Sequence, residues 1–187
     1  MIKFAGKILR RILNASELSE DKKSEILINR IRNKGGVVGN NVDIISSNID
    51  MGEPYLLSIG SNVTITGVKI LTHDASTYKQ LGHTKVGRVT IGDDVFVGWG
   101  SIILPDTKIG NKVIIGAGSV VAKDIPDNSV AAGSPCKVIC TYDEYMEKMK
   151  KRMAAEPCFD LLPEELMTDE HKAEREELIK HSKGFIK

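Results

Sequence analysis

The chain has 187 residues, of which 41% are hydrophobic and 27% charged, the composition of a single globular domain with small additions at its ends. Its net charge of +1 argues against a nucleic-acid-binding protein with a broad basic face. The sequence contains no apolar run long enough to cross a membrane, so stable membrane insertion is not expected.

The N-terminal segment and the cysteines bear on where the protein acts. Basic residues interrupt the apolar residues of MIKFAGKILRRIL, so the segment lacks the continuous apolar stretch of a secretory signal. Cys136, Cys140 and Cys158 are odd in number and loosely spaced, which is not typical of a disulfide framework. We therefore expect a cytoplasmic protein with free thiols.

Two helices are predicted within residues 1–35, which we interpret as an N-terminal helical cap. Residues 2–13 place their apolar side chains near one face and their basic side chains elsewhere. Such a helix either lies on a membrane surface or packs on the open end of a β-structure, where it shields unpaired strand edges. We favour the second interpretation because a repeat core needs capping. A second helix is predicted over Ser19 to Arg32.

The strongest pattern in the sequence is a repeat of six residues. Six residues turn an α-helix through about 600°, so the repeat defines no single helical face, and glycines after the repeated residues would weaken one long strand. Short strands joined by corners that tolerate positive φ fit both features, and three such hexads close a coil of eighteen residues. Stacked coils then pair as parallel strands about 4.8 Å apart, with the repeated residues pointing inward. These residues are Ile91, Val97, Ile103, Ile109, Ile115 and Val121, and the glycines are Gly92, Gly98, Gly110 and Gly116.

The repeat region is predicted over residues 36–140, and it is interrupted once. The pattern is ragged at Ile44 to Pro54, becomes regular at Ile59, Ile65 and Leu71, and then disappears until Ile91. A gap of twenty residues is not a multiple of six, so residues 74–90 are expected to leave the coil as a projecting loop. Interruptions of repeat proteins gather on the functional face, which makes this loop the first place to look for a site.

The last part of the chain, residues 141–187, is predicted to form a helical extension. One helix is expected over Thr141 to Met153, and another begins near Thr168 and ends before Gly184. The apolar face of the last helix is thin, so we expect a peripheral arm or a trimer-stabilising tail.

Ile91 to Ile139 resembles the final coils of the hexapeptide-repeat acyltransferases. The motifs VGxxxxILP, IGNKVIIGAGSVVAKDIP and AAGSPCKVI occur in the same order as in that family. Together with the preceding segment IGSNVTITGVKILTHDAS, the resemblance covers Ile59 to Ile139. Sugar O-acetyltransferases of capsule and surface-polysaccharide gene clusters are the most similar branch, and maltose and galactoside acetyltransferases are more distant. The resemblance implies an all-β core, a left-handed parallel β-helix with N- and C-terminal helical extensions. It also implies a homotrimer with active sites between subunits and acetyl-CoA along the coils.

Acetyl transfer to a hydroxyl needs a general base, and histidine is suited to that role near neutral pH. His73 ends a regular coil where the projecting loop begins, and it occupies the base position of the family that the chain resembles. The related maltose and galactoside enzymes orient this histidine with a carboxylate further along the loop, but here no acid lies between Asp74 and Asp93. We therefore expect Asp74 or a backbone carbonyl to orient His73.

The other histidines are weaker candidates. His83 lies within the projecting loop, where it either lines the acceptor pocket together with Tyr78 or faces solvent. His171 and His181 lie on the charged C-terminal helix and are expected to be solvated. The cysteines lie beyond the repeats and no Gly-x-Ser-x-Gly motif is present, so direct attack is expected in place of an acyl-enzyme.

The resemblance places acetyl-CoA contacts on five residues of the coils and their end. Small residues would let the pantetheine arm lie close to the coil, and the two lysines would offer positive charge to the CoA phosphates. Trp99 stands where the family usually has a small residue, and Cys140 stands where it often has arginine. Both departures weaken the expected CoA contacts. The five residues are Trp99, Ala117, Ala122, Lys123 and Lys137.

Three alternatives remain open from the sequence. The first is N-acetylation of an amino sugar with the same base and donor. The second is a zinc lyase resembling γ-class carbonic anhydrase, which needs three imidazoles, whereas His73 and His83 alone lie in the coil region. The third is a β-helix scaffold that has lost activity. The leading prediction is an acetyl-CoA-dependent O-acetyltransferase that acts on a sugar and needs no metal.

Overall fold

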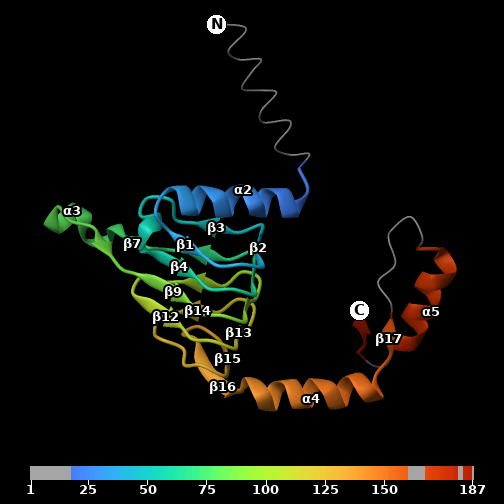
Figure 1. Cartoon of the computed structure of the whole chain (residues 1–187). Coiled ribbons are helices and arrows are strands. Elements are labelled where there is room, and N and C mark those ends of the chain that lie inside the picture. Colours follow the sequence, from blue (N-terminus) through green and yellow to red (C-terminus); the bar gives the residue numbers. More distant parts are fainter. Residues whose placement is uncertain (1–17, 160–166, 181–182, 187) are drawn as a thin grey trace, which may run out of the picture. The chain divides into compact units, whose positions relative to one another are not determined.

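A computed structural model describes residues 18–159, 167–180 and 183–186 (Figure 1). The predicted helix over residues 2–13 lies outside the described residues. The chain divides into two compact units after Tyr142, and each is considered by itself. Within the described residues, every helix is too short or too polar to traverse a bilayer.

The first unit is a parallel β-helix in which the chain visits three sheets in turn. Sheet A contains β1 (Val37–Val38), β4 (Leu57–Ile59), β9 (Val89–Ile91) and β12 (Thr107–Ile109). Sheet B contains β2 (Val42–Ile45), β5 (Val63–Thr66), β10 (Val95–Val97), β13 (Val113–Ile115), β15 (Ser129–Ala132) and the antiparallel edge strand β16 (Lys137–Thr141). Sheet C contains β3 (Asn48–Ile49), β6 (Lys69–Ile70), β11 (Ile102–Ile103) and β14 (Val120–Val121).

The six-residue repeat fills the interior of this β-helix as predicted. All six repeated residues are buried, at 1% exposure or less. Ile91 pairs with Ile109 and Val97 pairs with Ile115, so the coil between these residues contains the expected eighteen residues. One earlier position differs: Ile70 is buried and pairs with Ile103, whereas Leu71 is half-exposed. The corner before Ile70 is one residue shorter than the corner before Ile103, which shifts the inward position by one.

The glycines of the repeat serve a purpose other than the predicted one. Gly92 and Gly110 do not adopt positive φ; Asp94 and Lys112, two residues further on, do. A Cβ at Gly92 would lie 2.7 Å from the carbonyl oxygen of Gly110, one coil away. Glycine is therefore required there because successive coils stack too closely for a side chain.

The helix α2 (Glu20–Asn33) covers the N-terminal end of the β-helix (Figure 1). Ser19 caps it by accepting a hydrogen bond from the backbone N–H of Lys22, as expected at a helix start. Ile28 and Ile31 are buried and join the core. The cap that the sequence suggested for residues 2–13 is provided in the described part of the chain by α2.

The projecting loop predicted over residues 74–90 is present, but the chain returns to the coil slightly earlier, at Val89, where β9 begins. The chain passes through β7 (His73–Asp74), the 3-10 turn η2 (Ala75–Thr77), α3 (Tyr78–Leu81) and β8 (Lys85–Val86), which pairs antiparallel with β7. A second excursion, with the 3-10 turn η1 (Pro54–Leu56), separates the first coil from the second. Figure 1 shows α3 standing away from the stacked strands.

The described residues of the second unit form two helices and a pair of short parallel strands. Its elements are α4 (Tyr142–Ala155), β17 (Cys158–Phe159), α5 (Asp169–Ile179) and β18 (Phe185–Ile186). Arg152 forms an ion pair with Glu156 and lies over the Phe185 ring, 5.6 Å from its centroid. The side chains of α4 and α5 are all exposed or half-exposed.

Replacing Ile103 with alanine should destabilise the protein strongly. The side chain is fully buried between β6 and β14, and truncation would leave a cavity inside a narrow core. We expect a loss of about 2–5 kcal/mol in the free energy of unfolding. Urea denaturation followed by circular dichroism would measure it, with the exposed Ile26→Ala on α2 as the matched control. Equal effects of the two substitutions would contradict the assignment of Ile103 to the core.

Candidate active site

His73 lies at the corner where sheet C ends and the projecting loop begins. Directly beside it, one coil earlier, the chain leaves β3 at Asp50. Ile49 pairs with Ile70, and the Asp50 N–H donates a 2.9 Å hydrogen bond to the Ile70 carbonyl. Stacking of β3 on β6 therefore brings together two side chains that are 23 residues apart in the sequence.

Asp50 is a buried carboxylate that accepts hydrogen bonds from four donors. One oxygen accepts from the N–H of Gly52 at 2.9 Å. The other accepts from the N–H and the hydroxyl of Thr72, at 3.1 and 2.8 Å, and from Nδ1 of His73. Burial alone would raise the pKa of Asp50, but these hydrogen bonds outweigh it, so the pKa lies below its usual range. Asp50 is therefore ionised at neutral pH.

The Asp50 carboxylate determines the protonation pattern of the His73 ring. An ionised carboxylate only accepts hydrogen bonds, so Nδ1 of His73 must carry the proton in this contact. Nε2 of the neutral ring then has a free lone pair. The Asp50 side chain is 7% exposed and the His73 side chain 42%, so the anchoring group is buried while the ring is accessible. A buried acid that orients a histidine is the arrangement used in general-base catalysis.

Asp74 does not take the orienting role that the sequence suggested. It forms a 2.6 Å ion pair with Lys85 across the β7–β8 pair and accepts a hydrogen bond from the N–H of Ser76. The Lys85 ammonium, with the contribution of Ser76, lowers the pKa of Asp74 to about 2. Asp74 therefore stabilises the start of the projecting loop through Lys85. The carboxylate that contacts His73 is Asp50.

Asp50 was not predicted as the partner of His73 because it precedes His73 by 23 residues and lies in residues 44–54, where the six-residue repeat is irregular. Asp50 follows the short strand β3, whose inward Ile49 stacks on Ile70. Aligning β3 with β6 by their inward residues would have placed Asp50 beside Leu71, close to His73.

The loop residues proposed for the acceptor lie on or next to α3. Tyr78 begins α3 and is exposed. His83 is also exposed, and its Nδ1 lies 2.7 Å from the carbonyl oxygen of Leu81. His171 belongs to the N-terminal capping box of α5, and His181 lies outside the described residues.

The residues predicted to contact CoA lie mainly along sheet C and its two edges. Ala122 directly follows β14 and is exposed, and Lys123 follows it at the corner after sheet C. Trp99 and Ala117 lie at the opposite corner, between sheets B and C, where the N–H of Gly118 donates to the Trp99 carbonyl. His73 and the Trp99–Ala117 corner thus stand at opposite edges of sheet C.

Lys137 begins β16 and pairs with Ala132 at the C-terminal end of the β-helix. It lies near the end of the corner that contains Trp99 and Ala117, since Gly116 there packs against Ala132. Cys140 pairs with Val130 further along the same strand. The structure therefore arranges the Trp99, Ala117 and Lys137 positions in order along the coil axis.

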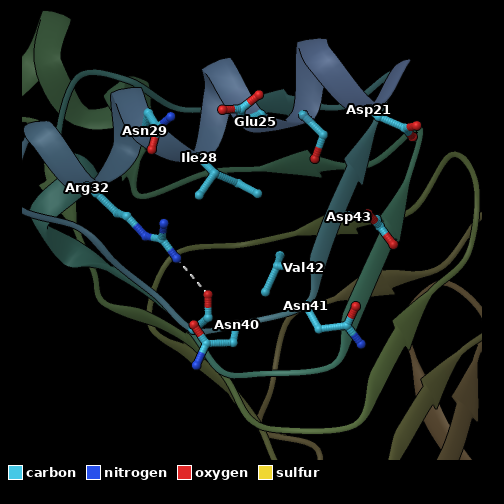
Figure 2. Close-up of a pocket in the computed structure, with 11 residues that line it drawn as sticks. Asp21, Glu25, Ile28, Asn29, Arg32, Asn40, Asn41, Val42 and Asp43 are labelled. Carbon is cyan, nitrogen blue, oxygen red and sulfur yellow. Dashed lines mark hydrogen bonds between the residues drawn. The ribbon is translucent and has the colours of Figure 1, made fainter. Parts of the chain in front are cut away.

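A separate pocket lies between α2 and the first coil (Figure 2). It has a volume of about 370 Å³ and is lined mainly by polar side chains, including Asp21, Glu25 and Asp43. The Arg32 guanidinium at its edge donates hydrogen bonds to the carbonyls of Val38 and Gly39, and so is committed to holding α2 on the coil. None of the predicted site residues lines this pocket.

Comparison with known proteins identifies the family. Residues 88–123 match the family described as bacterial transferase hexapeptide (six repeats). The protein CapG of Staphylococcus aureus is 45% identical over 139 residues, which cover 71% of this chain and 76% of CapG. The galactoside O-acetyltransferase of Escherichia coli is 34% identical over 154 residues, covering 72% of this chain and 76% of that enzyme. The chain belongs to the hexapeptide-repeat acetyltransferase family.

Solved structures agree with this assignment of an acetyltransferase. A hexapeptide-repeat acetyltransferase from Vibrio cholerae, complexed with acetyl coenzyme A, superimposes with a TM-score of 0.52 at 25% identity. A galactoside acetyltransferase in complex with coenzyme A gives a TM-score of 0.50 at 32% identity. These matches cover 58% and 59% of this chain, and 61% and 56% of those chains. This chain therefore spans less than two thirds of either structure.

The comparisons and the structure do not support the scaffold or the zinc-lyase interpretation in the way that they support an acetyltransferase. The relationship to named acetyltransferases makes this chain an enzyme, so the scaffold interpretation is set aside. Among the described residues, His, Cys, Asp and Glu side chains form no group of three or more that could hold a metal ion. The described part of the acetyltransferase thus presents a histidine–carboxylate pair as its clearest candidate for chemistry.

Proposed function

We propose that this acetyltransferase moves an acetyl group from acetyl-CoA to a hydroxyl of a sugar or polysaccharide precursor, with His73 as general base. The observation that carries the proposal is the contact between the buried Asp50 carboxylate and Nδ1 of His73. This contact favours the tautomer that a base requires, while the His73 side chain stays accessible.

The reaction follows from the position of the two nitrogens. Nε2 of His73 removes the proton of the acceptor hydroxyl as its oxygen attacks the thioester carbonyl. The imidazolium formed is stabilised by Asp50 through Nδ1–H. As the carbon–sulfur bond breaks, the ring returns the proton to the leaving thiolate. The acetyl ester and free CoA result, and His73 is again neutral.

A sugar is the acceptor that the relatives favour. The galactoside O-acetyltransferases of Escherichia coli and Lactococcus lactis are 34% and 46% identical to this chain over their matched regions. Tyr78 and His83 on the projecting loop are exposed and are proposed to contact the acceptor. N-acetylation of an amino sugar is the second candidate, because the same base would serve an amine.

We further propose a left-handed coil and a homotrimer, with each active site between two subunits. Within one chain, His73 and the Trp99–Ala117 corner are separated by the width of sheet C, so one chain does not join the base to the proposed donor groove. The projecting loop supports an interface, because it exposes three apolar side chains that a monomer would leave in water. These are Tyr78, Leu81 and Val86.

The donor is proposed to lie along the corner between sheets B and C. At that corner Ala117 offers a small side chain, and Lys137 near its end is exposed and able to pair with CoA phosphates. Ala122 and Lys123 lie at the opposite edge of sheet C, so in the proposed trimer they would contact the donor held by a neighbouring subunit. The three cysteines are free thiols, which supports the proposed cytoplasmic location.

Purified protein mixed with acetyl-CoA and a panel of sugars and nucleotide sugars tests this function. We expect thiol release that depends on an added sugar, and a product whose acetyl group is lost in mild alkali, as an ester requires. An alkali-stable product would identify the N-acetyltransferase instead. Failure of every hydroxyl and amine acceptor to release thiol would overturn both candidates.

A further inference from the structure

Trp99 is a large side chain at a corner where the neighbouring coils have small residues, Gly67 on the coil before and Ala117 and Gly118 on the coil after. Two coils compare directly, because Val97 pairs with Ile65 and Ile103 pairs with Ile70. Ile103 follows Val97 by six positions on the coil of Trp99, whereas Ile70 follows Ile65 by five positions on the preceding coil. The preceding coil therefore has one residue fewer at this corner.

The Trp99 indole occupies the space left by that missing residue. It packs on Gly67, which adopts positive φ, and a Cβ at Gly67 would lie 2.6 Å from the indole Cε3. Towards the C-terminus the next coil offers only Ala117 and Gly118, with open space at the Cβ position of Gly118. The indole thus covers Gly67, and Trp99 is 61% exposed.

The indole reaches the height of the catalytic base. Gly67 and His73 belong to the same coil and are six residues apart in the sequence. Trp99 belongs to the following coil, and its indole packs on Gly67. In a trimer whose axis runs along the coil, equivalent coils lie at the same height. The Trp99 indole of one subunit then faces the level at which a neighbour's His73 acts.

We propose that Trp99 limits the length of the acyl group that the enzyme accepts. The inference rests on the proposed function, in which the thioester must lie at the height of His73. An acyl chain longer than acetyl would extend from that point towards Gly67, and the indole already fills this space. A small residue at position 99 would expose the bare backbone of Gly67 and extend the groove by about one coil, 4.8 Å.

The test compares W99A and W99F with the parent protein, using acetyl-, propionyl-, butyryl- and hexanoyl-CoA. W99A should raise the ratio of kcat/KM for butyryl-CoA to kcat/KM for acetyl-CoA by about 10–100-fold. The reason is that each methylene group that fits into an apolar pocket changes kcat/KM about tenfold or more. W99F is the matched control, since its ring fills most of the same space, and its ratio should stay within about threefold of the parent.

A second readout monitors the donor site without turnover. Trp99 is the only tryptophan in the sequence, so its fluorescence should change when free CoA binds. Retained acetyl transfer in W99A with an unchanged acyl ratio would overturn the inference alone. A changed acceptor KM with the same acyl ratio would assign the indole to the acceptor and overturn it too. No thiol release by the parent protein with any donor would overturn the proposed function itself.

Discussion

Replacing His73 with alanine should lower kcat by about 10²–10⁴-fold, the range expected when a general base is removed. The hydroxyl oxygen would have to attack while still protonated, because no other group would then take its proton. Binding of CoA should change little, since its proposed contacts are made by other residues of the coils. Single-turnover thiol release and calorimetric titration with CoA would separate the two effects.

His171→Ala is a suitable control for this experiment. That histidine lies in the capping box of α5, and its loss should leave kcat within about twofold of the parent. Full turnover by His73→Ala would remove the proposed base. An equal loss of kcat in both variants would point to a general effect on folding instead.

Replacing Asp50 with asparagine should lower kcat by about 10²–10⁴-fold while leaving the imidazole in place. The carboxylate accepts from Gly52 on one oxygen and from Thr72 and His73 on the other. An amide has one oxygen and one NH₂ group. Its NH₂ group must therefore face hydrogen-bond donors, either the Gly52 N–H on one side or the Thr72 and His73 donors on the other. If the NH₂ faces His73, Nδ1 must accept and Nε2 carries the proton, which is the wrong tautomer for a base.

Asp74→Asn distinguishes the two carboxylates that could orient the base. Because Asp74 pairs with Lys85 and not with His73, we expect a loss of less than about tenfold in kcat. A larger loss in Asp74→Asn than in Asp50→Asn would return the orienting role to Asp74. NMR of the His73 ring nitrogens would show the tautomer change in Asp50→Asn directly.

The low pKa of Asp50 also predicts how stability depends on pH. A carboxyl group with a lower pKa in the folded state stabilises that state above its unfolded pKa of about 3.9. This contribution is lost as the pH falls through the folded-state pKa, which lies lower. The difference in urea midpoint between the parent and Asp50→Asn should therefore be constant above about pH 5 and shrink below pH 4. A constant difference down to pH 2 would contradict the lowered pKa.

Much of the scaffold could be predicted from local order in the sequence. Each hexad places one Ile or Val inward, and this regular spacing determines both the interior and the eighteen-residue coil. The helix from Glu20 to Asn33 was also predictable, because its cap Ser19 and its buried face lie within a single segment. The position of His73, at the point where the repeat stops, marked the candidate base.

The tertiary structure decided what lies beside that base. Stacked coils bring together residues about one coil apart, and excursions such as the one containing η1 alter the spacing, so the partner of His73 is not found by counting. Asp50, and not Asp74, contacts His73 because Ile49 stacks on Ile70. Likewise, only the shorter corner of the preceding coil shows that the Trp99 indole has Gly67 to pack upon. The hexads therefore determined the coil, whereas the register between coils determined the site, because contacts between coils depend on every insertion and deletion that separates them.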